Sequence, residues 1–122
     1  MPETLSIDLQ TSDDGKTRLF VLHGDLDVAT SPSLRAALAE AASKGEHNII
    51  VDLSRLGFLD STCLGALIAA DKQAKLHNGD VRLVAHEGQI LRLLRITGLL
   101  DVLRVYADID AALLGSTPLA GI

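Results

Sequence analysis

The hydrophobic and polar positions of the chain follow distinct patterns, which predict where the strands and helices lie. Apolar side chains alternate with polar ones over residues 5–9, and a largely apolar run covers residues 18–24. Turn-forming residues at 12–16 separate the two, so we expect an antiparallel hairpin. Residues 49–53 carry apolar side chains at every position except Asp52, which is typical of a central strand covered on both faces.

Two longer segments have the spacing of amphipathic helices. The first begins at the start signal Thr30–Ser33, which has Pro inside its first turn, and ends near Gly45. The second extends over about residues 61–77. Its apolar, core-facing side is formed by Leu64, Leu67, Ile68 and Ala74. On its solvent-facing side we place Asp71, Lys72 and Lys75.

The remaining sequence continues the alternation of strands and helices. We expect a strand at 81–84, a short amphipathic helix at 89–96, a short strand at 102–106 and a last helix at 109–114. A hairpin followed by such alternation predicts an α/β fold. Its sheet is expected to be mixed, with about five strands and with the helices mostly on one face.

The sequence has the properties of one domain. Its length of 122 residues suits a single core, and no repeat, low-complexity stretch or linker divides it. We therefore expect one domain over residues 1–122. Its core covers about residues 5–114, and residues 115–122 form a flexible tail.

Charge and composition exclude several classes of function. The net charge is −5 and aromatic residues make up 2%, so the chain lacks the basic face and stacking platform of a direct nucleic-acid binder. No apolar run approaches the ~20 residues of a membrane span, and the first residues have no signal-peptide pattern. Cys63 is the one cysteine, so an intramolecular disulfide cannot form. We expect a cytoplasmic protein without membrane insertion.

The most informative segment is Phe58–Gly65, where an apolar strand gives way to a helix. Short polar side chains at such a point accept hydrogen bonds from the free N–H groups of the first helical turn. The same N–H groups and the helix dipole also stabilise a phosphate. Ser61 is therefore either an ordinary helix cap or a switch that carries a phosphate.

Enzyme chemistry finds little support. The chain has no phosphate-binding Gly-x-x-x-x-Gly-Lys-Ser/Thr loop, no dinucleotide-binding glycine motif after the first strand and no Gly-x-Ser-x-Gly motif around Ser61. Cys63 has no identifiable partner base, which favours a packing role over a catalytic thiol. The histidines lack metal-ligand spacing; they are His23, His47, His77 and His86. We expect no enzymatic activity, no catalytic residue, no cofactor and no metal.

Four carboxylates at strand ends and loops have two interpretations. These residues are Asp25, Asp27, Asp52 and Asp60. Paired carboxylates perform acid–base chemistry or hold Mg²⁺. Aspartate is also a preferred capping residue of turns and helices, and sequence spacing alone favours this second role.

Three separated motifs carry a resemblance to a known family. They are Gly24-Asp25-Leu26-Asp27, the stretch Asp52–Gly65 that contains Phe58-Leu59-Asp60-Ser61-Thr62-Cys63-Leu64-Gly65, and Arg92–Leu99, a helix that ends in Thr-Gly-Leu. With these motifs the chain resembles the STAS domain family and, within it, the bacterial anti-sigma factor antagonists. The resemblance covers about residues 5–114 and implies the STAS fold.

The resemblance implies a regulatory function in transcription and stress response. In such antagonists the serine after the aspartate, here Ser61, is phosphorylated by the partner, an anti-sigma factor that is also a serine protein kinase; Thr62 is the weaker alternative. The unphosphorylated form binds the anti-sigma factor and releases a sigma factor. Phosphorylation switches this binding off, and a phosphatase reverses it.

The partner is expected to contact residues around the switch. The candidates are Asp25, Asp27, Leu59, Asp60, Thr62, Cys63 and Leu64. For both leucines, packing in the core is an equally good interpretation. The family usually has Gly where this chain has Cys63, and we expect the cysteine to add bulk to the partner surface.

Two other classes of function stay open. STAS domains also occur as subunits of lipid-transport ATPase complexes and of other membrane complexes, so the chain could be a soluble subunit of that kind. An enzyme or small-molecule binder is the third interpretation, although the chain offers no complete set of nucleophile, base and orienting group.

Overall fold

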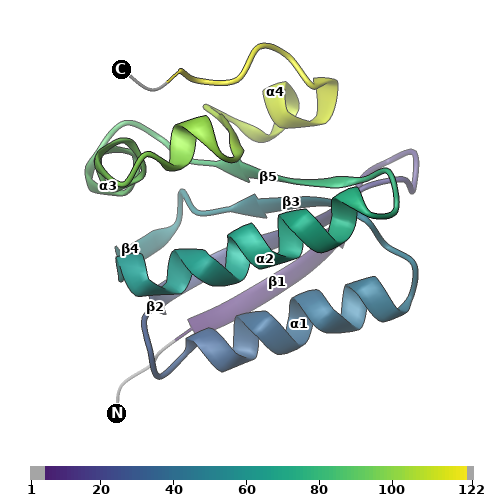
Figure 1. Cartoon of the computed structure of the whole chain (residues 1–122), viewed down its shortest axis with the longest axis horizontal. Coiled ribbons are helices and arrows are strands. Elements are labelled where there is room, and N and C mark those ends of the chain that lie inside the picture. Colours follow the sequence, from purple (N-terminus) through teal and green to yellow (C-terminus); the bar gives the residue numbers. More distant parts are fainter. Residues whose placement is uncertain (1–4, 121–122) are drawn as a thin grey trace.

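The computed structural model describes residues 5–120, which form a six-stranded sheet and four α-helices (Figure 1). The strands are β1 (Leu5–Thr11), β2 (Arg18–Leu26), β3 (Asn48–Asp52), β4 (Leu56–Leu59), β5 (Asp80–Val84) and β6 (Arg104–Tyr106). The α-helices are α1 (Ser31–Ser43), α2 (Leu64–Lys75), α3 (Gln89–Ile96) and α4 (Ile109–Leu114). Two short 3₁₀ helices precede α2 and β6; they are η1 (Ser61–Cys63) and η2 (Leu99–Asp101).

The sheet is mixed, as the sequence predicts. Strands β1 and β2 form the antiparallel hairpin, and the other pairings are parallel in the order β1-β2-β3-β5-β6. Strand β4 lies off this path and pairs with the last residues of β2. The expectation of about five strands is therefore one too low. Four residues that include a glycine carry too little periodicity to distinguish β4 from a loop.

The helices cover the sheet unequally. Helices α1, α2 and α3 pack their apolar faces on one side of the sheet, and α4 lies on the other side (Figure 1). The central strand β3 serves both cores, because Ile49 and Val51 point to the larger core and Ile50 points to the smaller one. This confirms the prediction of helices mostly on one face and of a buried central strand.

The hairpin turn is held by its own polar side chains. The Ser12 hydroxyl donates to Asp14 Oδ1 (2.7 Å), and the Lys16 N–H donates to the same atom (3.0 Å). These hydrogen bonds, the one from Ser12 first, hold the pKa of Asp14 below its ordinary value. The segment forms the tight turn that its composition predicts.

The expected tail contacts the domain through Leu119. Residues 115–120 form no helix or strand, but the Leu119 N–H donates to the Val105 carbonyl (2.8 Å) and the Leu119 side chain packs on the larger core. Residues 121–122 lie outside the described residues. The flexibility of the tail stays a prediction.

The predicted solvent-facing side of α2 is wrong at one position. Asp71 is 4% exposed, whereas Lys72 and Lys75 are exposed. The Asp71 carboxylate accepts a hydrogen bond from the Val81 N–H (3.0 Å) and pairs with the Lys75 ammonium (2.9 Å). An acidic side chain is buried here because it satisfies a backbone donor at the start of β5 and keeps one charged partner at the surface.

We expect Asp71→Ala to lower the free energy of unfolding by about 1–3 kcal/mol, because the buried Val81 N–H would lose its acceptor. Urea denaturation measures this effect. The neighbouring exposed variant Lys72→Ala is the control and should change the same quantity by less than about 0.5 kcal/mol. Equal stability of the two variants would contradict a structural role for Asp71.

Candidate functional site

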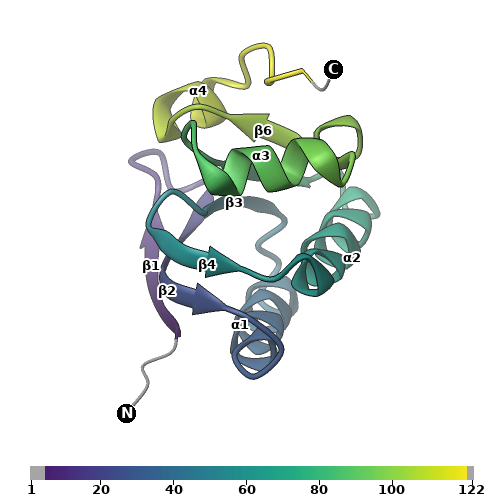
Figure 2. The same ribbon diagram turned by 90° about the vertical axis from the view of Figure 1, so that its left-hand side faces the viewer.

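The segment that carries Ser61 begins where β4 ends (Figure 2). The Asp60 N–H donates to the Leu26 carbonyl (2.9 Å), which extends the β2–β4 pairing by one hydrogen bond. The chain then turns through η1 into α2. Two motifs that are distant in sequence, residues 24–27 and 58–63, are thereby held side by side.

Asp60 caps this helical segment. Its Oδ1 atom accepts from the Thr62 N–H (3.0 Å) and from the Thr62 hydroxyl (2.9 Å). The Cys63 N–H donates to the Asp60 carbonyl (2.9 Å). The capping role therefore belongs to Asp60 and not to Ser61, because Asp60 satisfies the free Thr62 N–H group of the turn.

Ser61 and Thr62 are both exposed, but their hydroxyl groups differ. Within residues 5–120 the Ser61 hydroxyl forms no hydrogen bond, whereas the Thr62 hydroxyl is bound to Asp60. Ser61 thus presents an exposed hydroxyl without a hydrogen-bond partner among the described residues. The interpretation of Ser61 as an ordinary helix cap is wrong.

The carboxylates from the first motif lie at the same edge. Asp25 pairs in register with Phe58, and the Asp25 Oδ1 atom would be 3.5 Å from a Cβ placed on Gly57. The strand register shifts at Gly24, whose φ of 99° is readily adopted by glycine. Asp25 therefore lies against β4, next to Gly57.

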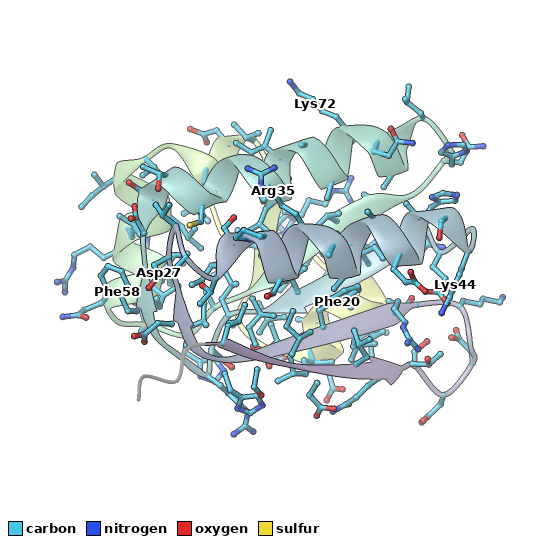
Figure 3. All side chains as sticks on the ribbon, turned by 90° about the horizontal axis from the view of Figure 1, so that it is seen from below. Phe20, Asp27, Arg35, Lys44, Phe58 and Lys72 are labelled. Carbon is cyan, nitrogen blue, oxygen red and sulfur yellow. The ribbon has the colours of Figure 1, made fainter. Side chains whose placement is uncertain are left out.

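Asp27 has a local structural role as well. It exchanges hydrogen bonds with Thr30: the Thr30 N–H donates to Asp27 Oδ1 (3.0 Å), and the Asp27 N–H donates to Thr30 Oγ1 (2.9 Å). These bonds hold the loop that leads into α1. Figure 3 shows Asp27 and Phe58 at the same end of the molecule.

Turn and cap formation accounts for three of the four carboxylates considered for acid–base chemistry. Asp52 is buried and accepts from the Ser54 N–H (2.9 Å) and the Ser54 hydroxyl (2.6 Å), which forms the turn after β3. Asp27 and Asp60 bind Thr30 and Thr62 as described above. Asp25 is the exposed member of the set.

Three of the expected partner contacts are core residues. Leu59, Cys63 and Leu64 are 5%, 2% and 4% exposed and belong to the larger core. Side chains buried to this extent offer almost no area to a partner, so the structure corrects their assignment as contacts. The expectation that Cys63 adds bulk to the surface is wrong for the same reason. Its thiol fills a position in the core.

Sequence reasoning missed two exposed apolar residues beside the site. Phe58 is 51% exposed, and Val28, in the loop before α1, is also exposed. The strict alternation of a half-buried strand does not hold in β4, where both Gly57 and Phe58 are exposed. The signal in the sequence for a residue near the site was the position of Phe58, two residues before the helix cap Asp60.

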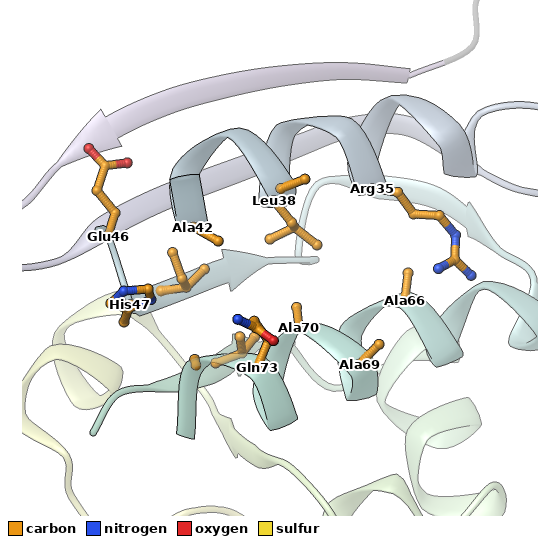
Figure 4. Close-up of a pocket in the computed structure, with 13 residues that line it drawn as sticks. Arg35, Leu38, Ala42, Glu46, His47, Ala66, Ala69, Ala70 and Gln73 are labelled. Carbon is orange, nitrogen blue, oxygen red and sulfur yellow. The ribbon is translucent and has the colours of Figure 1, made fainter. Parts of the chain in front are cut away.

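A cleft and a pair of stacked histidines lie away from the segment that carries Ser61. A cleft of about 200 Å³ between α1 and α2 is lined by six alanines among thirteen residues, with Arg35 towards one end and His47 at the other (Figure 4). The His47 and His77 rings stack with centroids 4.2 Å apart. Across residues 5–120, no group of three or more His, Cys, Asp or Glu side chains is arranged to hold a metal ion.

The described part of the chain has helices of at most 13 residues. None of its helices combines the length and the apolar character needed to cross a bilayer.

Comparison with known proteins identifies the family. The model of the STAS domain matches residues 6–112. An anti-sigma-B factor antagonist of Listeria monocytogenes is 29% identical over 101 residues, which cover 83% of this chain and 88% of that protein.

Solved structures share the fold. An anti-sigma factor antagonist from Mycobacterium paratuberculosis superposes with a TM-score of 0.84 at 24% identity, covering 94% of this chain and 96% of that one. The Bacillus cell fate determinant SpoIIAA in its phosphorylated form gives a TM-score of 0.66 at 21% identity, over 87% and 96% of the two chains. With the matched motifs, the sheet order and the family model in agreement, this chain belongs to the STAS domain family.

Proposed function

We propose that the protein is an anti-sigma factor antagonist that is switched by phosphorylation of Ser61. The observation that carries the proposal is the free, exposed hydroxyl of Ser61 beside an aspartate that already caps the helix. The similarity to anti-sigma-B factor antagonists supports the functional class. In the cytoplasm, the unphosphorylated form binds a kinase-type anti-sigma factor and releases a sigma factor, and a phosphatase restores this form.

A phosphate on Ser61 is compatible with the local fold. It would add about −1.5 to −2 charges at pH 7. The start of a helical segment favours an anion, and the Ser61 hydroxyl has no existing hydrogen bond in residues 5–120 to lose. Phosphorylation should therefore act on the surface that meets the partner and leave the domain folded.

The charge around Ser61 makes such a switch effective. Among the described residues, Asp25, Asp27 and Asp60 form no ion pair, so the phosphate would join a surface that is already acidic. A phosphate that loses water without gaining a partner costs several kcal/mol, and about 1.4 kcal/mol changes affinity tenfold. One modification is thus sufficient to release the anti-sigma factor.

Incubation with a cognate kinase-type anti-sigma factor and ATP should add one phosphate, which intact mass spectrometry detects. Ser61→Ala should abolish the modification, and Thr62→Ala should retain it, because the Thr62 hydroxyl is engaged by Asp60. Phosphate on Ser61→Ala protein would show that the acceptor is another residue. An unmodified Ser61 in cells, together with co-purification of membrane ATPase subunits, would favour the lipid-transport alternative.

The free energy of unfolding should distinguish Asp60, the helix cap, from Ser61, the proposed switch. We expect Asp60→Ala to lower the free energy of unfolding by about 0.5–2 kcal/mol, because the cap is lost. Ser61→Ala should change it by less than about 0.5 kcal/mol. Chemical denaturation of the two variants measures both values. A larger loss for Ser61→Ala than for Asp60→Ala would contradict the assigned roles.

The phosphomimetic Ser61→Glu should weaken binding to the anti-sigma factor by about tenfold or more, since its charge is desolvated against the partner. Its thermal unfolding midpoint should stay within about 4 °C of the unmodified protein, a shift that corresponds to ~1 kcal/mol or less. Calorimetric titration and thermal denaturation measure the two effects. Weak binding caused by unfolding would appear as a large drop in the midpoint.

A further inference from the structure

The outer edge of β4 borders a groove. Strand β4 pairs with β2 along one edge, and α3 lies next to its other edge (Figure 2). The groove between them measures about 400 Å³. Its walls include Leu56, Phe58, Gln89, Ile90 and Leu93.

Phe58 is anomalous among the aromatic residues of the chain. The other two, Phe20 and Tyr106, are each 1% exposed, whereas half of Phe58 remains in contact with water. Aromatic side chains contribute strongly to binding when a partner covers them, and they are enriched at the centres of protein interfaces. A half-exposed phenylalanine on the wall of an apolar groove therefore suggests a surface that a partner covers.

The groove shares Phe58 with the strand that leads directly to Ser61. Phe58 is the register partner of Asp25 and is followed within three residues by Asp60 and Ser61. Val28, on the neighbouring loop, adds another exposed apolar side chain at this end of the molecule. The groove has the Asp25 carboxylate beside Gly57 of its wall, and Asp60 follows two residues after Phe58. We call these two carboxylates the acidic rim, and the complement of this surface is an apolar side chain flanked by basic residues.

We propose that this groove seats an apolar side chain of the kinase-type anti-sigma factor and anchors that protein beside Ser61. The proposal rests on the function proposed above and adds the source of the affinity. The groove supplies apolar contact area in both states of the protein. The phosphate on Ser61 then acts against this contact from the acidic rim.

The groove and Ser61 therefore have different roles, and substitutions in the two regions should affect binding and phosphorylation differently. Loss of the Phe58 ring should weaken binding and raise the KM for phosphorylation, while kcat stays unchanged because the acceptor hydroxyl is untouched. Loss of the Ser61 hydroxyl should stop phosphorylation and leave binding of the unphosphorylated protein intact. Substitution of a residue that merely supports the fold would instead change binding, phosphorylation and stability together.

The experiment uses the full chain and the kinase-type anti-sigma factor that phosphorylates it in the assay above. Phe58→Ala removes the aromatic ring from the wall of the groove, and Gln89→Trp places a large side chain at the groove from an exposed position. Leu76→Ala, an exposed apolar residue beyond the opposite end of α2, is the matched control. We expect Kd to rise at least about tenfold for the first two variants and to stay within about twofold for the control.

Thermal denaturation of each variant shows that it is folded. The inference is overturned if Phe58→Ala and Gln89→Trp bind like the unmodified protein while Ser61→Glu binds weakly. That result would leave the proposed function standing. If the unmodified protein neither binds nor accepts phosphate from any anti-sigma factor of this type, the proposed function fails and the groove assignment fails with it.

Discussion

The parallel pairing of β2 with β4 determines the arrangement of the whole candidate site. It joins the last residues of β2 to a four-residue strand and continues into the hydrogen bond between the Asp60 N–H and the Leu26 carbonyl. Because this ladder holds Asp25 and Leu26 against Phe58 and Leu59, the first motif comes to lie beside the strand that leads to Ser61. The site depends on strand register more than on any contact between its own side chains.

The elements with a strong hydrophobic period could be predicted from the sequence, and the site's finer assignments could not. The hairpin, the central strand and the helices follow from alternation and from helical spacing. Strand β4 is too short to show a period, and Asp71 is buried because it binds the distant Val81 N–H. Such tertiary hydrogen bonds leave no trace in local patterns.

The division of the segment after β4 into surface and core also required the structure. The sequence indicates that a helix starts at about residue 61, but it does not give the rotation of that helix about its axis. The structure turns Leu59, Cys63 and Leu64 inward and leaves Ser61 and Thr62 outside. A small thiol in the core and a free hydroxyl at the surface are consequences of the same rotation.

The register between β2 and β4 also limits how the chain can vary in length. Three residues, 53–55, connect β3 to β4, and β4 is joined directly to the segment that carries Ser61. An insertion or deletion of one residue in this connection would shift the register in which Phe58 and Leu59 pair with Asp25 and Leu26. The hairpin turn at 12–17 has no such constraint, so natural length differences should accumulate there and be rare at 53–55.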